Sequence, residues 1–172
     1  EYIKDVAGHS HAEEDLASEK ARIQALLDRA NGERVATIRG DMARGMTKGI
    51  GVFRDQASME GALENLKNVK SRMGGFSIEN KGKVFNTDLM FGLELEFMVD
   101  CAEAVVAGAL TRKESRGAHF RTDITERDDE NWLKHTLAWH GDTGAIQIAY
   151  RPVHLKTLTD DAETIAPKVR TY

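Results

Sequence analysis

Apolar residues recur every three or four positions in several separate stretches of this chain, which is the pattern of helices that each bury one face. The first predicted helix covers residues 11–31. We expect it to begin at a capping box formed by Ser10 and Glu13, and to end at a left-handed turn of Asn31 and Gly32.

Two more helices are predicted before residue 75. The second has an apolar stripe of Val35, Ile38, Met42 and Met46. We expect it to end or kink at Gly49–Gly51, because each glycine costs about 1 kcal/mol inside a helix. The third helix is predicted from about residue 56 to residue 73, and Gly74 and Gly75 stop it.

The fourth predicted helix starts at the cap residue Asn86 and is apolar around about three quarters of its circumference. This predicts a central helix packed on several sides, with Cys101 as a core residue. Glu94 falls inside the apolar arc, so we expect it to pair with an arginine from a neighbouring helix or from a docked domain. The predicted buried stripe consists of Phe91, Leu95, Met98, Ala102, Val105 and Ala109.

A polar arm follows at residues 114–135, dense in both charge signs and without helical or strand periodicity. We expect an arm that is not part of the core. It is either a solvated loop whose ion pairs are each worth at most about 1 kcal/mol, or a set of arginine–carboxylate forks that hold a domain or subunit interface. The interface candidates are Arg116, His119, Arg121, Arg127, Asp128 and Trp132.

Alternating apolar residues after the arm predict a β-hairpin around a loop of residues 141–144. A loop of that length opposes Trp139 to Ile146. Pro152 ends the hairpin, and the tail to residue 172 is expected to be extended and partly docked. The predicted fold is mainly α, a spectrin-repeat-like bundle of three to four helices followed by the arm, a small β-hairpin and an extended tail. We expect a helical bundle domain at 1–113 and a small α+β module at 114–172.

Composition narrows the function classes. The chain is 41% hydrophobic and 30% charged with a net charge of -4, which is typical of a globular protein and disfavours nucleic acid or anionic lipid as a partner. An apolar run long enough to span a membrane is absent from the sequence, so we expect no direct membrane insertion. The chain begins with Glu1, so we expect a processed protein or a piece of a longer one.

Signatures of catalysis are weak in this sequence. The glycine-rich stretch Gly45–Gly51 lacks the spacing of a phosphate-binding loop and is interpreted as a helix end. His9 and His11 form only a weak metal pair, and the other histidines are interpreted as structural. We therefore predict no catalytic, cofactor-binding or metal-binding residues in this chain.

The residues of the arm closely resemble the C-terminal signature of succinate dehydrogenase and fumarate reductase flavoprotein subunits. The resemblance rests on residues 112–136 and extends to Val52–Asp55, Phe85–Thr87, Tyr150–Val153 and residues 167–172. One difference is the pair Ile124 and Thr125, where many members carry an aromatic residue and a proline.

This resemblance implies the role of the chain. An FAD-binding domain and a capping domain would precede it and carry the flavin and dicarboxylate sites. The parent subunit would oxidise succinate to fumarate by hydride transfer to FAD and pass electrons to an iron–sulfur subunit and a quinone. The chain itself is expected to be a structural and docking domain, inactive and without bound FAD when isolated.

The implied partners are the FAD-binding domain of the same subunit and the iron–sulfur subunit, with no nucleic acid. The implied location is the cytoplasmic face of the inner membrane, or the matrix side in mitochondria, as part of a membrane-associated complex. The fragment itself is expected to be soluble, and surface uncovered in it would favour self-association.

Two alternatives remain open at this point: the C-terminal domain of L-aspartate oxidase, and a free-standing helical adaptor. A G-x-G-x-x-G strand–turn–helix encoded upstream would exclude the adaptor. Succinate oxidation and fumarate reduction share the signature, so the direction of the reaction is not predicted.

Overall fold

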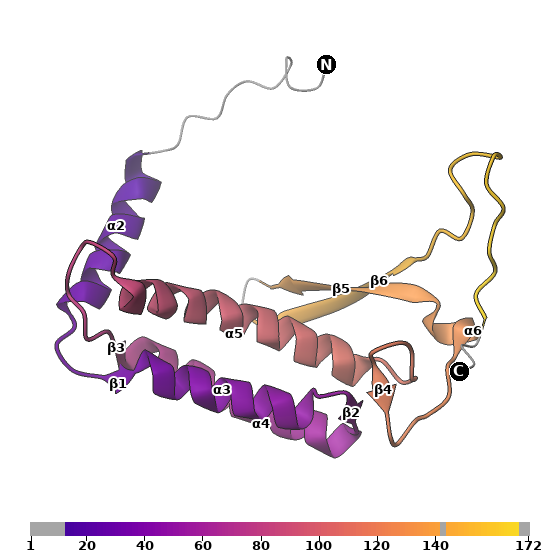
Figure 1. Ribbon diagram of the computed structural model, residues 1–172, viewed down its shortest axis with the longest axis horizontal. Helices are drawn as coiled ribbons and strands as arrows, with labels where there is room; N and C mark the ends of the chain where they lie inside the picture. Colours follow the sequence, from indigo (N-terminus) through magenta and orange to yellow (C-terminus); the bar gives the residue numbers. More distant parts are fainter. Residues whose placement is uncertain (1–12, 142–143, 169–172) are drawn as a thin grey trace, which may run out of the picture. The chain divides into compact units, whose positions relative to one another are not determined.

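The computed structural model describes residues 13–141 and 144–168, and the mainly α fold predicted from the sequence is confirmed (Figure 1). Within these residues the helices are α2 (Glu13–Asp28), α3 (Val35–Gly49), α4 (Gln56–Arg72), α5 (Thr87–Thr111) and the short α6 (Asp129–Trp132). Side chains are described from Leu16 onward.

The strands form separate two-stranded sheets. Two of these sheets are short and parallel: β1 (Glu33–Arg34) pairs with β3 (Phe76–Ser77), and β2 (Phe53–Arg54) pairs with β4 (Phe120–Arg121). The third sheet is the antiparallel hairpin of β5 (Lys134–His140) and β6 (Ile146–Pro152). Each parallel pair joins segments that are far apart in the sequence.

The described residues fall into two compact units. Unit 1 takes the described residues within Glu1–Gly45 and Glu64–Cys101, and unit 2 takes those within Met46–Leu63 and Ala102–Tyr172. Segments of α3, α4 and α5 contribute to both units. The domain boundary expected after residue 113 remains a prediction.

Unit 1 has an apolar core. Its fully buried side chains come from three helices and from the segment around β3, and they include Ile38, Leu66, Val69, Phe76 and Leu95. Unit 2 buries apolar side chains such as Met59 and Val106, but it also buries Glu114, Ser115 and Arg121. Burial of ionised side chains therefore distinguishes unit 2.

The first helix differs from its prediction at its C-terminal end. α2 ends at Asp28, and neither Asn31 nor Gly32 has a positive φ. Gly32 is needed for another reason: a Cβ atom there would lie 2.3 Å from the carbonyl oxygen of Gly75. The predicted capping residue Ser10 lies outside the described residues.

The second and third helices match their predictions. α3 ends at Gly49, and its stripe residues Val35, Ile38 and Met42 are buried. α4 ends at Arg72 and is followed by a 3₁₀ turn at Met73–Gly75.

Helix α5 starts as predicted but is less buried than predicted. The Asn86 side chain caps it, because Oδ1 accepts a hydrogen bond from the backbone N–H of Leu89 at 2.8 Å. The buried positions are Leu95, Val99, Ala102, Val106 and Ala109, whose spacing of four, three, four and three covers a single face.

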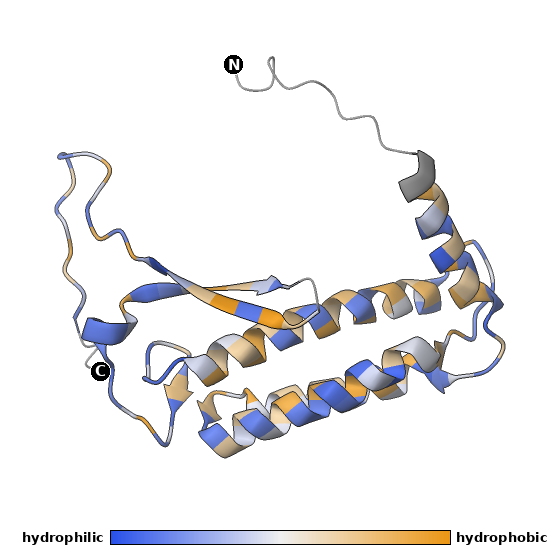
Figure 2. Cartoon of the chain, turned by 180° about the vertical axis from the view of Figure 1, so that it is seen from behind, coloured by the Kyte–Doolittle hydropathy of each residue, from blue (hydrophilic) through white to orange (hydrophobic). Residues whose placement is uncertain are grey.

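The opposite side of α5 is open, although hydropathy colouring in Figure 2 shows a largely hydrophobic helix. Phe97 is 64% exposed, and Glu94 and Cys101 are also exposed. Within the described residues α5 is therefore packed on one face only, and the prediction of Cys101 as a core residue is wrong. The described residues supply no buried arginine partner for the exposed Glu94, and pairing with a docked domain remains a prediction.

The hairpin is confirmed, but its predicted register is wrong by one residue. Trp139 pairs with Gln147, and Ile146 pairs with His140. The backbone N–H of Gly141 donates to the carbonyl of Ala145 at 2.8 Å, so Gly141 belongs to the ladder and not to the loop. The loop is therefore one residue shorter than predicted, and every cross-strand pair shifts by one residue. Gly144 has φ +76°, the left-handed conformation that three-residue hairpin loops require at their last position.

Candidate functional site

The arm of unit 2 is a folded part of the core, contrary to the expectation of an arm outside it. Glu114 is 0% exposed and Arg121 is 1% exposed, and Ser115 is buried as well. A buried charge is costly unless it is paired and hydrogen-bonded. The partners of Glu114 and Arg121 therefore decide how this region is held together.

Glu114 is the centre of an ion cluster. Its Oε1 accepts from Arg112 Nη1 at 2.5 Å and from Arg116 Nε at 2.8 Å. Its Oε2 accepts from Arg116 Nη2 at 3.0 Å and from the backbone N–H of Asp128 at 2.9 Å. Arg116 therefore makes a bidentate contact with the carboxylate through Nε and Nη2, a geometry that strengthens arginine–carboxylate pairs.

The pKa of the Glu114 carboxyl lies below its ordinary value. Burial acts in the opposite direction, but hydrogen bonds from Arg116, the Asp128 amide and Arg112 outweigh it. Glu114 is therefore ionised at neutral pH even though it has no access to solvent.

The cluster continues through Asp129 at the start of α6. Arg116 Nη2 donates to Asp129 Oδ1 at 2.6 Å, and Arg127 Nη2 donates to Asp129 Oδ2 at 2.5 Å. Hydrogen bonds from Arg116 and then Arg127 lower the pKa of Asp129. Arg127 Nη1 also donates to the backbone carbonyl of Lys168 at 2.8 Å, so the tail is partly docked, as predicted. We call Arg112, Glu114, Arg116, Arg127 and Asp129 the arm cluster.

A second fork joins the arm to the N-terminus of α4. Arg121 donates from Nε to Asp123 Oδ1 at 2.9 Å and from Nη2 to Oδ2 at 2.6 Å. Asp123 Oδ2 also accepts from the backbone N–H of Gln56, the first residue of α4, at 3.0 Å. The hydrogen bond from Arg121 is the main cause of the lowered pKa of Asp123. A carboxylate at this helix end is also favoured by the helix dipole.

His119 lies in a tight turn of the arm. The turn is closed by backbone hydrogen bonds between Arg116 and His119 in both directions, and Gly117 has φ +58°, as the predicted turn requires. Burial is the main cause of the lowered pKa of His119. Its Nε2 is buried, and the described part of the chain supplies no hydrogen-bond partner for it.

Trp132 supports the join between α6 and the hairpin. Its ring lies edge-on to Tyr150 with centroids 5.7 Å apart. The Nζ atom of Lys134 lies 4.7 Å from the Trp132 ring centroid and 4.2 Å from that of Tyr150. Arg112 reaches the same region, donating to the backbone carbonyls of Trp132 at 2.9 Å and Lys134 at 2.7 Å.

All six predicted interface residues thus lie in unit 2, and each of Arg116, Arg121 and Arg127 has a carboxylate partner within it. Asp128 caps α6, accepting from the backbone N–H of Asn131 at 2.9 Å. Sequence reasoning missed the central role of Glu114. The available signal was local: arginines stand two residues before and two residues after it.

A hollow borders the arm cluster. It is an open pocket of about 930 Å³, with charged side chains and the ring of Phe120 on its walls. Its lining includes Arg116, Arg127, Asp129 and Lys168. Arg116 and Arg127 in this lining are both paired with Asp129.

The glycine-rich stretch after Gly45 does not fit a flavin phosphate site. The stretch from Gly45 to Gly49 is helical in α3, so its backbone N–H groups are engaged in the helix. A Cβ atom at Gly45 would lie 2.0 Å from Asn65 Oδ1, and one at Gly49 would lie 2.4 Å from the Ser58 carbonyl oxygen. Gly45 and Gly49 therefore allow α3 and α4 to pack closely.

Comparison with known proteins adds to this geometry. The sequence profile of the family described as fumarate reductase flavoprotein C-term matches residues 39–172. The chain is 43% identical over 135 residues to the fumarate reductase flavoprotein subunit of Haemophilus influenzae, covering 78% of this chain and 22% of the relative. It is 34% identical to the succinate dehydrogenase flavoprotein subunit of Rickettsia bellii, covering 100% of this chain and 29% of that protein.

A solved structure shows the same fold. A variant of E. coli quinol fumarate reductase superposes with a TM-score of 0.80 at 36% identity, over 90% of this chain and 27% of that one. The helices, arm and hairpin therefore define a C-terminal helical domain of flavoprotein subunits. The chain belongs to the succinate dehydrogenase and fumarate reductase flavoprotein family. It spans between a fifth and a third of the length of these relatives.

Proposed function

We propose that this chain is the structural and docking domain of a succinate dehydrogenase or fumarate reductase flavoprotein subunit. The observation that carries the proposal is the family match, which covers residues 39–172 and includes the whole arm. In the proposed parent subunit, FAD bound outside this chain exchanges a hydride with the succinate–fumarate pair. Electrons then pass to or from an iron–sulfur subunit and a quinone.

Exposed apolar side chains support a docking role. On α5, Phe97 is 64% exposed and Met90 is 47% exposed. Large apolar groups gathered on a protein surface commonly mark an interaction site. We propose that the open face of α5 packs against the flavin-binding domain of the same subunit.

The arm has a separate part in this proposal. The arm cluster and the Arg121–Asp123 fork hold the backbone of the arm rigid, so that a partner meets a preformed surface. Arg116, His119, Arg121, Arg127, Asp128 and Trp132 then act at the interface mainly by shaping this surface and the pocket beside it. The iron–sulfur subunit is the proposed partner there.

The proposed location is a complex associated with a membrane through other subunits. In the described part of the chain, no helix has the length and apolar character needed to cross a bilayer.

The experiment that tests this function uses the complete gene product that contains this chain. We expect it to carry bound FAD and to reduce an artificial electron acceptor with succinate but not with L-aspartate. The chain alone should show neither flavin absorbance nor activity. Reduction of the acceptor with L-aspartate would favour the L-aspartate oxidase alternative. A gene product without bound flavin would overturn the proposal.

A further inference from the structure

The hairpin has a backbone edge on β6 that none of the described residues covers. The backbone N–H of Gly141 donates to the Ala145 carbonyl, so these two residues form a hydrogen-bonded pair. Along an antiparallel ladder, hydrogen-bonded and non-hydrogen-bonded pairs alternate, and the alternation is counted from this pair. Gln147, Ala149 and Arg151 then bond to β5. The N–H and C=O groups of Ile146, Ile148 and Tyr150 point away from it. Pro152, which has no N–H, falls on this outward side, as the alternation requires.

The outer edge of β5 is already engaged at its start. Arg112 Nη2 donates to the Lys134 carbonyl oxygen at 2.7 Å and to Thr136 Oγ1 at 3.1 Å. On β6, no comparable contact is found among the described residues, and the sheet contains β5 and β6 alone within them. β6 is therefore the edge open to another strand.

From Ile146 to Tyr150 this edge lacks the features that normally prevent strand addition. Natural edge strands are blunted by proline, by inward-pointing charges or by bulges. The pairing from Ile146 to Pro152 is continuous, without a bulge, and the strand holds one charged residue, Arg151, and no proline before its last position.

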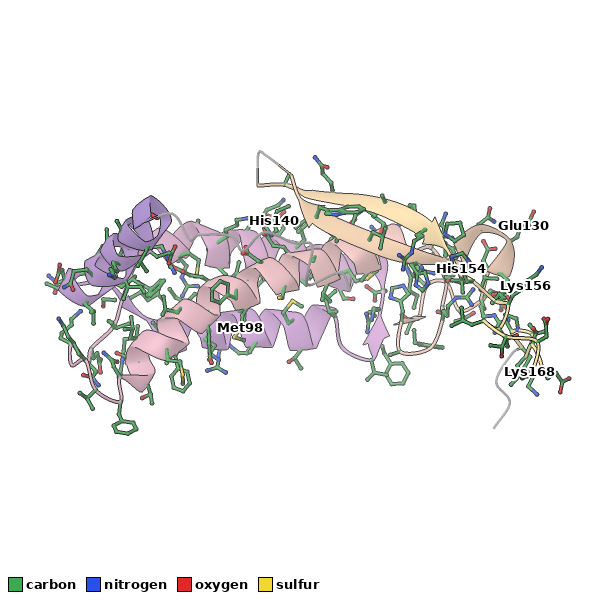
Figure 3. The ribbon with its side chains drawn as sticks, turned by 90° about the horizontal axis from the view of Figure 1, so that it is seen from above. Met98, Glu130, His140, His154, Lys156 and Lys168 are labelled. Carbon is green, nitrogen blue, oxygen red and sulfur yellow. The ribbon has the colours of Figure 1, made fainter. Side chains whose placement is uncertain are left out.

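The charge of the hairpin indicates the chemistry of a strand that this edge would accept. The hairpin strands carry Lys134 and Arg151 and no aspartate or glutamate, although the whole chain has a net charge of -4. The first residues after β6 add His154 and Lys156, which Figure 3 labels beyond the hairpin, whereas acidic residues follow only from Asp160 onward. Trp139, 50% exposed, supplies an apolar surface on the hairpin.

We propose that β6 accepts an additional β-strand from an extended, acidic polypeptide segment of a partner protein. Backbone hydrogen bonds to Ile146, Ile148 and Tyr150 supply the affinity, as in other cases of strand addition. Arg151 and Lys134 select acidic over basic segments. The inference depends on the hairpin alone and does not require the flavoprotein assignment.

The test uses the ¹⁵N-labelled chain and an acetylated peptide of alternating glutamate and valine, about eight residues long to match a strand of this length. Amide hydrogen exchange is followed by NMR. At saturating peptide, exchange of the Ile146, Ile148 and Tyr150 amides should slow by about tenfold or more, as for amides that join a ladder. Exchange of the Gln147, Ala149 and Arg151 amides should be unchanged, because they are bonded to β5 in both states.

Two controls make the result specific. A peptide with lysine in place of glutamate should bind at least about tenfold more weakly. Ile148→Pro removes one outward N–H without breaking the β5 ladder, and should weaken binding of the glutamate peptide by about tenfold or more. Protection of the inward amides in this variant shows that the hairpin is still folded.

The inference would be overturned by unchanged exchange of the outward amides with peptide, by equal binding of both peptides, or by full affinity in Ile148→Pro. Slowed exchange that rises with protein concentration in the absence of peptide would assign the edge to a second copy of this chain, and would also overturn it.

Discussion

The two units are stabilised in different ways. In unit 1, side chains such as Ile38, Leu66 and Phe76 are fully buried, and burial of apolar surface accounts for the core. In unit 2, the arm centres on Glu114 and Arg121, two ionised side chains that are almost completely buried.

This difference affects how each region tolerates change. An apolar core responds to lost volume, and its cost grows with the cavity that is left. A buried ion cluster responds to lost charge, because a single unpaired ion in the interior is very unfavourable. The arm should therefore be sensitive to pH and to charge substitutions that unit 1 tolerates.

The largest effect is expected for Glu114→Ala. The substitution leaves Arg112 and Arg116 without their buried carboxylate and frees the Asp128 amide, so the free energy of unfolding should fall by about 4 kcal/mol. Urea unfolding of the chain measures it, with Asp160→Ala in the exposed tail as the unaffected control. A loss below about 1 kcal/mol would mean that the arm behaves as a solvated loop.

A somewhat smaller effect is expected for Leu66→Ala in α4. Leu66 is 0% exposed, and its truncation should cost about 3 kcal/mol through lost burial and a cavity. The same urea experiment measures it, and the loss should be equal at low and high pH because no charge is involved. A loss that varied strongly with pH would contradict the distinction between the two units.

A smaller effect, spread over the acidic pH range, is expected from Glu114 itself. Its folded pKa lies below the ordinary value of 4.5, so the carboxylate contributes stability above that pH and loses it as pH falls through the folded pKa. The free energy of unfolding should decline on acidification below about pH 4.5. In Glu114→Gln this decline should be shallower. An unchanged slope in the variant would place the acid sensitivity elsewhere.

The helices were predictable because each depends on local signals. The stripe of Val35, Ile38 and Met42 identified α3, and the Asn86 cap identified the start of α5. The exposure of Phe97 was not predictable, since an apolar residue on a helix has the same periodicity whether or not a neighbour covers it. The sequence indicates that such a face requires cover but does not identify the covering element.

The arm shows the same limit for charged residues. Composition left a solvated loop and an ion-paired interface as equal alternatives, because pairing depends on which side chains the turns bring together. The turn at Gly117 places Arg116 so that it reaches both Glu114 and Asp129. The hairpin register was missed because it depends on a single hydrogen bond between Gly141 and Ala145.

The central claim is that the arm cluster stabilises the fold of this chain, whereas the open face of α5 contributes to assembly of the parent protein. Phe97→Ser separates these roles, because Phe97 is 64% exposed and its loss should leave the fold unchanged. A matched control is Lys67→Ser, an exposed position on α4.

The decisive measurement is the FAD content of the complete protein carrying each substitution, because the face that holds Phe97 is proposed to pack against the flavin-binding domain of the same subunit. We expect Phe97→Ser to lower the FAD content by about tenfold, as for an interface anchor, while Lys67→Ser matches the unsubstituted protein. Both substitutions should leave the urea midpoint of the isolated chain unchanged. Full FAD content in the Phe97→Ser protein would contradict the account.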